Sequence, residues 1–299
     1  STPATDAGFR SHREDFAEVL GPDPRLERVA AVDAHEGPVY VAEEDALYFT
    51  TVRTDGVSIK RLGLEDGIVT VVRADANTAN GMALDRDGRL VVCEQGTLST
   101  PARIARFSRA TGADETVVDS FDGLPLNSPN DVVVRSDGTI WFTDPCYGHL
   151  QGFRPEPVLP DAVYRYDPAT DTIARVADGF DKPNGLAFSL DERLLYVSDN
   201  GRPHHLLVFA VDSDSTLRDR RVLAVGTPEH PDGLAVDTRG RIYTSAACGV
   251  RVLSPGGELL GEIVLPGAVN FTFGGRGGST LFVTTDTSIW AATIAAKGA

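Results

Sequence analysis

The segment Asn130–Gly148 reads NDVVVRSDGTIWFTDPCYG and contains the pattern that decides the fold. A polar residue precedes an apolar run, a turn at Asp137-Gly138 follows, and a second apolar run ends at another polar residue. Two short apolar runs joined by an Asp-Gly turn are typical of a β-hairpin. The segment therefore predicts one hairpin.

The same pattern recurs along the chain, and its copies start 38 to 54 residues apart. Further strand candidates lie between the copies, at 102–108, 162–166, 206–211 and 249–253. A period of roughly 40 to 50 residues with about four strands is the signature of a propeller blade. Six copies predict an all-β protein, a six-bladed β-propeller with a central channel, formed as a single domain by residues 1–299. The other copies begin at Glu36, Asn80, Asn184, Asp232 and Asn270.

Few residues follow the last copy, since only 288–299 remain. We expect the N-terminal segment, within residues 16–32, to supply the outer strand of the last blade. This closure would cover an otherwise open sheet edge. A pair of packed β-sheets is the alternative architecture, but it predicts no fixed repeat.

The charge balance limits the partners of the chain. Its 299 residues include 43 acidic and 28 basic ones, which gives a net charge of −15. Such a surface repels phosphate backbones, so we expect no nucleic-acid partner. The chain has no uninterrupted apolar run of about 18 to 20 residues, so we expect no membrane span. The sequence leaves association open, and we expect a monomer or a weak homo-oligomer.

The cysteines indicate the compartment. Cys93, Cys146 and Cys248 show no CxxC spacing, which excludes a disulfide framework and a thiolate zinc site. Scattered cysteines fit a reducing environment, and the first residues contain no apolar run typical of a signal peptide. A processed chain would look the same. We therefore expect a cytoplasmic protein.

The first polar residue of each copy should lie on a ring around the propeller axis. Every member of this ring carries a side-chain oxygen. Turn chemistry explains an Asn-Gly or Asp-Gly pair, but it explains Glu36 poorly, and Asn130 has no glycine after it. Oxygen ligands with two carboxylates would instead suit a divalent cation: Ca²⁺ first, with Zn²⁺, Mn²⁺ or Mg²⁺ also compatible. Both interpretations stay open at this point. The ring comprises Glu36, Asn80, Asn130, Asn184, Asp232 and Asn270.

A second ring is predicted 14 or 15 residues further on, at the end of the next strand. It comprises Thr50, Glu94, Asp144, Asp199, Ala246 and Thr284 or Thr285. Three acids on consecutive blades would form an electronegative wall that accepts hydrogen bonds from substrate hydroxyls. Solvated carboxylates at strand ends are the alternative interpretation.

The segment NSPNDVVVRSDGTIWFTDPCYG, residues 127–148, resembles the signature of the gluconolactonase branch of the SMP-30/gluconolactonase/luciferin-regenerating-enzyme family. Further similar blocks occur in the right order, from EGPVY at Glu36 to NFTFGG at Asn270. The resemblance implies a six-bladed propeller with one divalent cation. It places the metal ligands at Glu36, Asn130, Asn184 and Asp232. The family usually has histidine where this chain has Gln95 and proline where it has Cys146, which leaves the exact substrate open.

The resemblance also implies hydrolysis of a sugar lactone to the hydroxy acid. A divalent cation can polarise the lactone carbonyl and lower the pKa of a bound water. Asp232 is the candidate general base, because a ligand carboxylate has a second oxygen to take the proton. The predicted substrate contacts are Asn80, Glu94, Asp144, Tyr147, His149 and Asp199.

Two other functions stand as alternatives to the lactonase. The first is another metal-dependent hydrolase or specialised pathway enzyme on the same propeller, acting on a phosphotriester or on a non-sugar ester or lactone. The second is a non-catalytic binding platform, which would have no reason to place Glu, Asn, Asn and Asp in one ring. The chain has no GxSxG motif, which disfavours a serine hydrolase mechanism.

Overall fold

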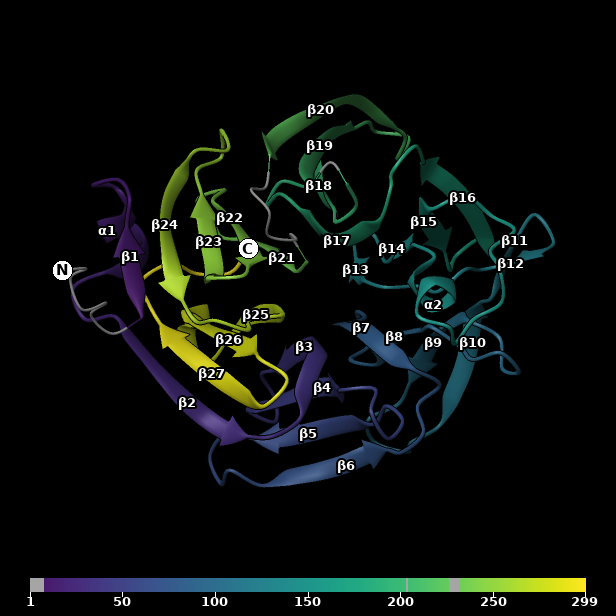
Figure 1. Ribbon diagram of the computed structural model, residues 1–299, viewed down its shortest axis with the longest axis horizontal. Helices are drawn as coiled ribbons and strands as arrows, with labels where there is room; N and C mark the ends of the chain where they lie inside the picture. Colours follow the sequence, from purple (N-terminus) through teal and green to yellow (C-terminus); the bar gives the residue numbers. More distant parts are fainter. Residues whose placement is uncertain (1–7, 203, 226–231) are drawn as a thin grey trace.

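Six antiparallel sheets stand around a common axis in the computed structural model, which describes residues 8–202, 204–225 and 232–299 (Figure 1). Each sheet is one blade, and its first strand lies nearest the axis. The predicted six-bladed β-propeller is confirmed.

The blades follow the chain in order. From the inner strand outward, the first blade contains β3 (Ala34–Val41), β4 (Ala46–Thr51), β5 (Ile59–Gly63) and β6 (Val69–Arg73). The second contains β7 (Ala79–Leu84), β8 (Leu90–Glu94), β9 (Arg103–Phe107) and β10 (Asp114–Val118). The third contains β13 (Val132–Val134), β14 (Ile140–Asp144), β15 (Ala162–Asp167) and β16 (Thr172–Ala177). The fourth blade contains β17 (Pro183–Phe188), β18 (Leu194–Asp199), β19 (His205–Val211) and β20 (Leu217–Val225). The fifth contains β21 (Leu234–Val236), β22 (Ile242–Ala246), β23 (Gly249–Leu253) and β24 (Leu259–Val264). The sixth contains β25 (Asn270–Gly274), β26 (Thr280–Thr284), β27 (Ser288–Thr293) and, outermost, β2 (Arg25–Ala31).

The N-terminal segment joins two blades. β2 (Arg25–Ala31) lies inside the segment expected to supply the outer strand of the last blade, and it pairs antiparallel with β27. β1 (Phe9–Ser11) adds a fifth strand to the fifth blade by pairing with β24, which the sequence analysis did not predict. Between them, α1 (Phe16–Leu20) buries Phe16 in the apolar cluster of these two blades. The segment therefore holds the fifth and sixth blades together.

The remaining elements are short. They are α2 (Tyr147–Leu150), the 3₁₀ turn η1 (Arg276–Gly278) and the ribbon β11 (Ser120–Phe121) with β12 (Leu124–Pro125). Within the described ranges, no helix has the length and apolar character needed to cross a membrane.

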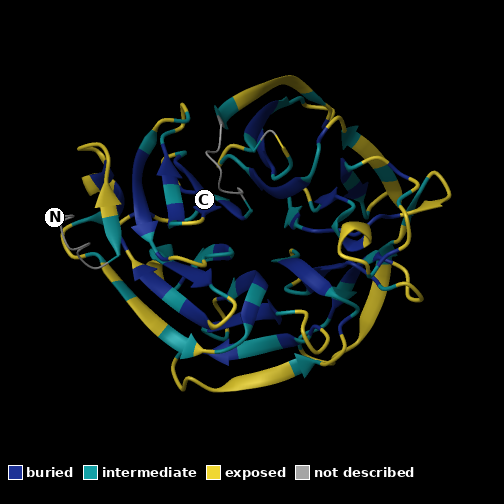
Figure 2. Cartoon of the chain, viewed as in Figure 1, coloured by how far each residue is buried: buried dark blue, intermediate teal, exposed yellow. Residues whose placement is uncertain are grey.

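Apolar side chains fill the space between neighbouring blades. Tyr48 of the first blade packs in one cluster with Leu90 of the second, and Trp141 of the third packs with Leu195 of the fourth. Figure 2 shows that the inner and middle strands are buried, whereas outer strands such as β6 are exposed. Each blade therefore buries its faces against the next blade.

Glycines allow the inner strands to approach one another closely. A Cβ added to Gly81 would lie 2.5 Å from the carbonyl oxygen of Asn130, and one added to Gly185 would lie 2.3 Å from that of Asp232. The N–H groups of these glycines donate to the same oxygens, at 2.9 and 3.1 Å. Gly81, Gly185 and Gly233 do not have a positive φ. Close approach between blades, rather than a positive φ, therefore explains the glycine after the ring residue in the second, fourth and fifth blades, whereas Gly37 combines a close approach with a φ of 57°.

Replacing Gly185 by alanine should destabilise the propeller. The new Cβ would collide with backbone of the next blade, so we expect the free energy of unfolding to fall by about 1–3 kcal/mol. Gly256→Ala is the matched control, because its nearest atom is Ser254 Oγ at 3.7 Å, and its effect should stay within about 0.5 kcal/mol. Urea unfolding of both variants measures the difference. Equal effects would contradict the close-approach explanation.

Candidate active site

A cavity of about 230 Å³ lies where the inner strands converge. It brings together six of the predicted site residues: Glu36, Asn80, Asn130, Tyr147, Asn184 and Asp232. The other four, Glu94, Asp144, His149 and Asp199, do not line it. All four residues predicted as metal ligands therefore share one cavity.

Hydroxyl groups hold the ring residues in place. In each case a hydroxyl near the end of a blade's second strand donates to the backbone carbonyl of a ring residue in the next blade. The pairs are Thr50 Oγ1 with Asn80 O (2.9 Å), Thr143 Oγ1 with Asn184 O (2.7 Å) and Ser198 Oγ with Asp232 O (3.0 Å). The carbonyls are thus used between blades, while the side chains line the cavity.

Glu36 is the most buried acid of the cavity, with 2% of its surface exposed. Its Oε1 accepts a hydrogen bond from Asn270 Nδ2 at 2.5 Å. Burial raises the pKa of Glu36 well above its usual range, and the charges of Asp232 and Asp131 raise it further. Burial also raises the pKa of Asp131 to about 7. Several carboxylates therefore repel one another around the cavity.

Asn130 has a buried side-chain oxygen, Oδ1, with no hydrogen-bond partner among the described residues. A buried acceptor without a hydrogen bond lowers the stability of the folded state, and a bound cation would offset this loss. Asn184 donates from Nδ2 to Tyr147 Oη at 3.4 Å, which orients its amide. No three His, Cys, Asp or Glu side chains gather as metal ligands in the described part of the chain. The candidate set is instead two carboxylates and two amides, an all-oxygen set that fits a hard divalent cation.

Tyr147 lines the same cavity from α2. Burial raises its pKa above the usual value, and the hydrogen bond from Asn184 opposes this effect. The phenol is therefore neutral at physiological pH and can donate a hydrogen bond. His149, two residues further along α2, is exposed and lies outside the cavity lining, so its contact with substrate stays a prediction.

Asp144 and Asp199 support loops rather than the cavity. Asp144 accepts hydrogen bonds from the backbone N–H groups of residues 127 and 128, both at 2.8 Å. Asp199 accepts those of residues 181, 182 and 201, at 2.9, 2.8 and 3.0 Å. Both acids are buried, and each fixes the loop that leads into an inner strand. The structure therefore does not place them as substrate contacts in the cavity.

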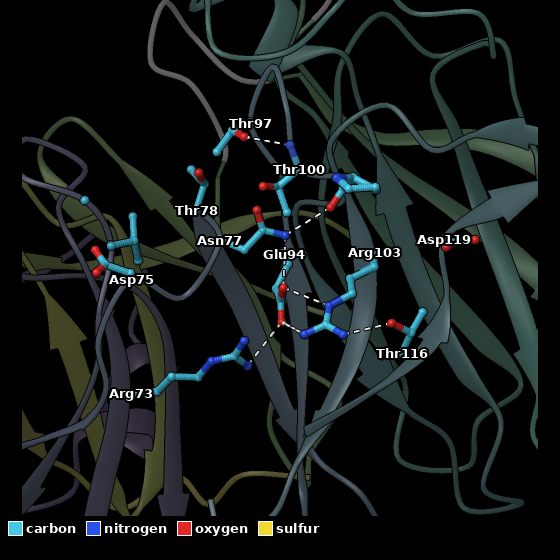
Figure 3. A pocket seen from close by; sticks show the side chains of 13 residues that line it. Arg73, Asp75, Asn77, Thr78, Glu94, Thr97, Thr100, Arg103, Thr116 and Asp119 are labelled. Atoms are coloured by element: carbon cyan, nitrogen blue, oxygen red, sulfur yellow. Dashed lines mark hydrogen bonds and ion pairs between the residues drawn. The ribbon is translucent and has the colours of Figure 1, made fainter. Parts of the chain in front are cut away.

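Glu94 points toward Arg103 and Arg73 (Figure 3) and does not line the central cavity. Its side chain is 1% exposed and forms ion pairs with Arg103 at 2.9 Å and with Arg73 at 3.4 Å. Its Oε1 also accepts a hydrogen bond from Asn77 Nδ2 at 3.0 Å. Both carboxylate oxygens are thus occupied, and Glu94 lines a separate, neighbouring cavity.

None of the predicted second-ring residues lines the central cavity. In the first, second and fourth blades the residue that follows the predicted one lines it instead: Thr51, Gln95 and Asn200. Adjacent residues of a strand point to opposite sides, so Thr143 and Ser198 face the next blade, whereas the acids that follow them do not. Extending the count by one residue would have found Thr51, Gln95 and Asn200.

Among the cavity residues that were not predicted are His35, Thr51, Arg53, Gln95, Gln151 and Asn200. Thr51, Gln95 and Asn200 each directly follow a residue of the predicted second ring, whereas Arg53 and Gln151 have no repeated position. Burial alone would lower the pKa of His35, but the hydrogen bond of its Nδ1 with Asp286 at 2.5 Å and the charge of Asp286 raise it overall. Arg53 donates to Gln151 at 3.3 Å and stacks on Phe153, so it connects the first blade to the α2 region.

Residues 34–287 match the family described as the SMP-30/Gluconolactonase/LRE-like region. The chain belongs to this family. It is 31% identical over 275 residues to a gluconolactonase of Zymomonas mobilis, covering 83% of this chain and 75% of that protein. It is 27% identical to the pentonolactonase XacC of Haloferax volcanii, covering 84% and 80%. A gluconolactonase structure from Xanthomonas campestris superposes with a TM-score of 0.87 at 36% identity, covering 98% of this chain and 96% of that one.

Removing the Asp199 carboxylate should destabilise the fold. Three backbone N–H groups would lose their acceptor, so we expect Asp199→Ala to lower the free energy of unfolding by about 1–3 kcal/mol. Asp23→Ala is the control, because Asp23 is in an exposed ion pair with Arg25, which contributes at most about 1 kcal/mol. Urea unfolding compares the two. An Asp199 variant as stable as the control would restore this acid as a candidate substrate contact.

Proposed function

We propose that this protein hydrolyses a sugar lactone to the corresponding hydroxy acid, using one divalent cation in the central cavity. The observation that carries the proposal is the convergence of Glu36, Asn130, Asn184 and Asp232 on one small cavity. Family membership and the lactonase names of the relatives support the same reaction class. The unpaired buried oxygen of Asn130 supports a bound cation.

Glu36, Asn130, Asn184 and Asp232 would hold the cation. An all-oxygen set favours Ca²⁺, while Zn²⁺, Mn²⁺ and Mg²⁺ remain compatible with it. When bound, a divalent cation supplies Lewis-acid polarisation of a carbonyl and a water of lowered pKa. It would also balance the repulsion that raises the pKa of Glu36.

The chain's own side chains would carry out the proton transfer and hold the substrate. Asp232 takes the proton of the attacking water as general base. Asn80 and the neutral phenol of Tyr147 line the cavity and can hydrogen-bond to the hydroxyl groups of a sugar lactone.

Removal of metal should abolish lactone hydrolysis. We expect EDTA-stripped protein to be inactive toward glucono-1,5-lactone, a pentonolactone and an aliphatic γ-lactone, and one of the four cations to restore activity. The same cation should raise the free energy of unfolding, by about 2.7 kcal/mol at 100 times its Kd. A phosphotriester tested beside the lactones examines the alternative hydrolase. Full lactone turnover without any metal would contradict the metal-dependent mechanism.

Substitution of Asp232 should remove activity while the propeller stays folded. Asp232→Ala should abolish metal-dependent turnover, because a ligand and the general base are both lost. Asp232→Asn keeps an oxygen ligand, so its kcat should fall by about 10²–10⁴-fold while more of the metal affinity remains. Asp23→Ala, far out on the surface, is the control. Steady-state kinetics and metal titration measure both effects, and unchanged turnover in Asp232→Ala would refute the mechanism.

A further inference from the structure

A second, larger cavity adjoins the proposed active site. This annex, about 580 Å³ in volume, lies at the first and second blades (Figure 3). Its walls include Asp75, Asn77, Thr100, Arg103, Thr116 and Asp119. Val57 and Thr78 line both the annex and the central cavity, so the two spaces share a wall. Small-molecule pockets usually measure about 300–1,000 Å³, a range that the annex meets and the central cavity of about 230 Å³ does not.

The wall between the two cavities is strained. Asn77 and Thr78 both have a φ of 54°, in the left-handed region that a β-branched threonine rarely adopts. The Thr78 hydroxyl donates to Gly96 O at 2.9 Å, and Asn77 Nδ2 donates to Pro101 O at 3.0 Å. These bonds hold the strained backbone in one conformation. Strain of this kind gathers at ligand sites, where the surrounding structure maintains it.

The strand end beside this wall serves both cavities. Glu94, the last residue of β8, lines the annex, and Gln95, which follows it, lines the central cavity. A molecule that occupies both spaces would therefore pass beside one fixed segment of backbone and one strand end.

The charges of the annex favour a neutral ligand. Its two arginines, Arg73 and Arg103, are already paired with the buried Glu94. Asp75 and Asp119 add two exposed carboxylates to the lining, so acids outnumber bases and a phosphate group would be repelled.

The polar groups of the annex match a polyol. The hydroxyls of Thr97, Thr100 and Thr116 and the two exposed carboxylates can exchange hydrogen bonds with sugar hydroxyls. Asn77 also has a side-chain oxygen with no partner among the described residues. The lining is thus rich in donors and acceptors without a surplus of positive charge.

We propose that the annex is a second subsite, which binds a neutral sugar ring joined by a glycosidic bond to the lactone in the central cavity. This inference rests on the proposed lactonase function and narrows its substrate class to glycosylated aldonolactones. The lactone ring would occupy the small central cavity, and the attached sugar would extend past Thr78 into the annex.

Steady-state kinetics with four substrates test the subsite: cellobiono-1,5-lactone, melibionolactone, glucono-1,5-lactone and 6-phosphoglucono-1,5-lactone. We expect a KM about tenfold lower for at least one disaccharide lactone than for glucono-1,5-lactone. Thr116→Trp should fill the annex and bring the ratio of these two KM values toward one. Thr70→Trp is the matched control, because Thr70 is an exposed threonine on the outer strand β6 that lines neither cavity, and it should keep the wild-type ratio. Thr100→Trp repeats the test from another wall if the Thr116 variant fails to fold.

Calorimetry separates failure of the subsite from failure of the proposed function. Cellobionic acid should bind more tightly than gluconic acid, and Thr116→Trp should remove the difference. If no lactone is hydrolysed but this difference is present, the lactonase proposal falls and the sugar subsite stands. If glucono-1,5-lactone is hydrolysed but neither disaccharide lactone nor cellobionic acid is preferred, the subsite is refuted and the lactonase stands. A preference for the phosphorylated lactone would also refute the neutral-sugar subsite.

Discussion

The hydrogen bond from one blade to the ring-residue carbonyl of the next is the contact on which the rest of the structure depends. Thr143 Oγ1 binds the carbonyl of Asn184, and the N–H of Gly185 binds that of Asp232. These contacts set how closely the inner strands pack around the axis. Because the backbone oxygens are used in this closure, the side-chain oxygens of the same residues remain for the cavity. The same contacts therefore close the propeller and position the residues of the site.

This closure concentrates negative charge in a region with little water. Burial raises the pKa of Glu36 and Asp131, and the charge of Asp232 raises both further. A folded protein keeps such a cluster only where the rest of the structure compensates, as the apolar contacts between blades do here. The cluster thus opposes stability, and a bound cation would turn its repulsion into attraction.

Features that recur in every repeat could be predicted from the sequence, whereas features outside the repeat could not. Six recurring hairpins predicted six blades, and the shared first position brought Glu36, Asn130 and Asp232 to one cavity. Counting missed the residues that line the cavity because neighbouring residues of a strand end point to different sides, as Glu94 in the annex and Gln95 in the central cavity do. Arg53 and the annex could not be predicted, since they belong to segments without a repeated position.

The proposed reaction depends on residues at repeated positions, whereas substrate specificity would depend on residues outside the repeat. Ring residues take part in blade closure through their backbone carbonyls, so a side-chain substitution there changes the site while these closure contacts remain. Arg53 contributes to neither the ring nor the apolar clusters, yet it lines the cavity mouth and reaches Gln151. Substitutions at such positions change the shape and charge of the mouth while the blades stay closed. A propeller of this kind can therefore keep one reaction and change its substrate through a few loop residues.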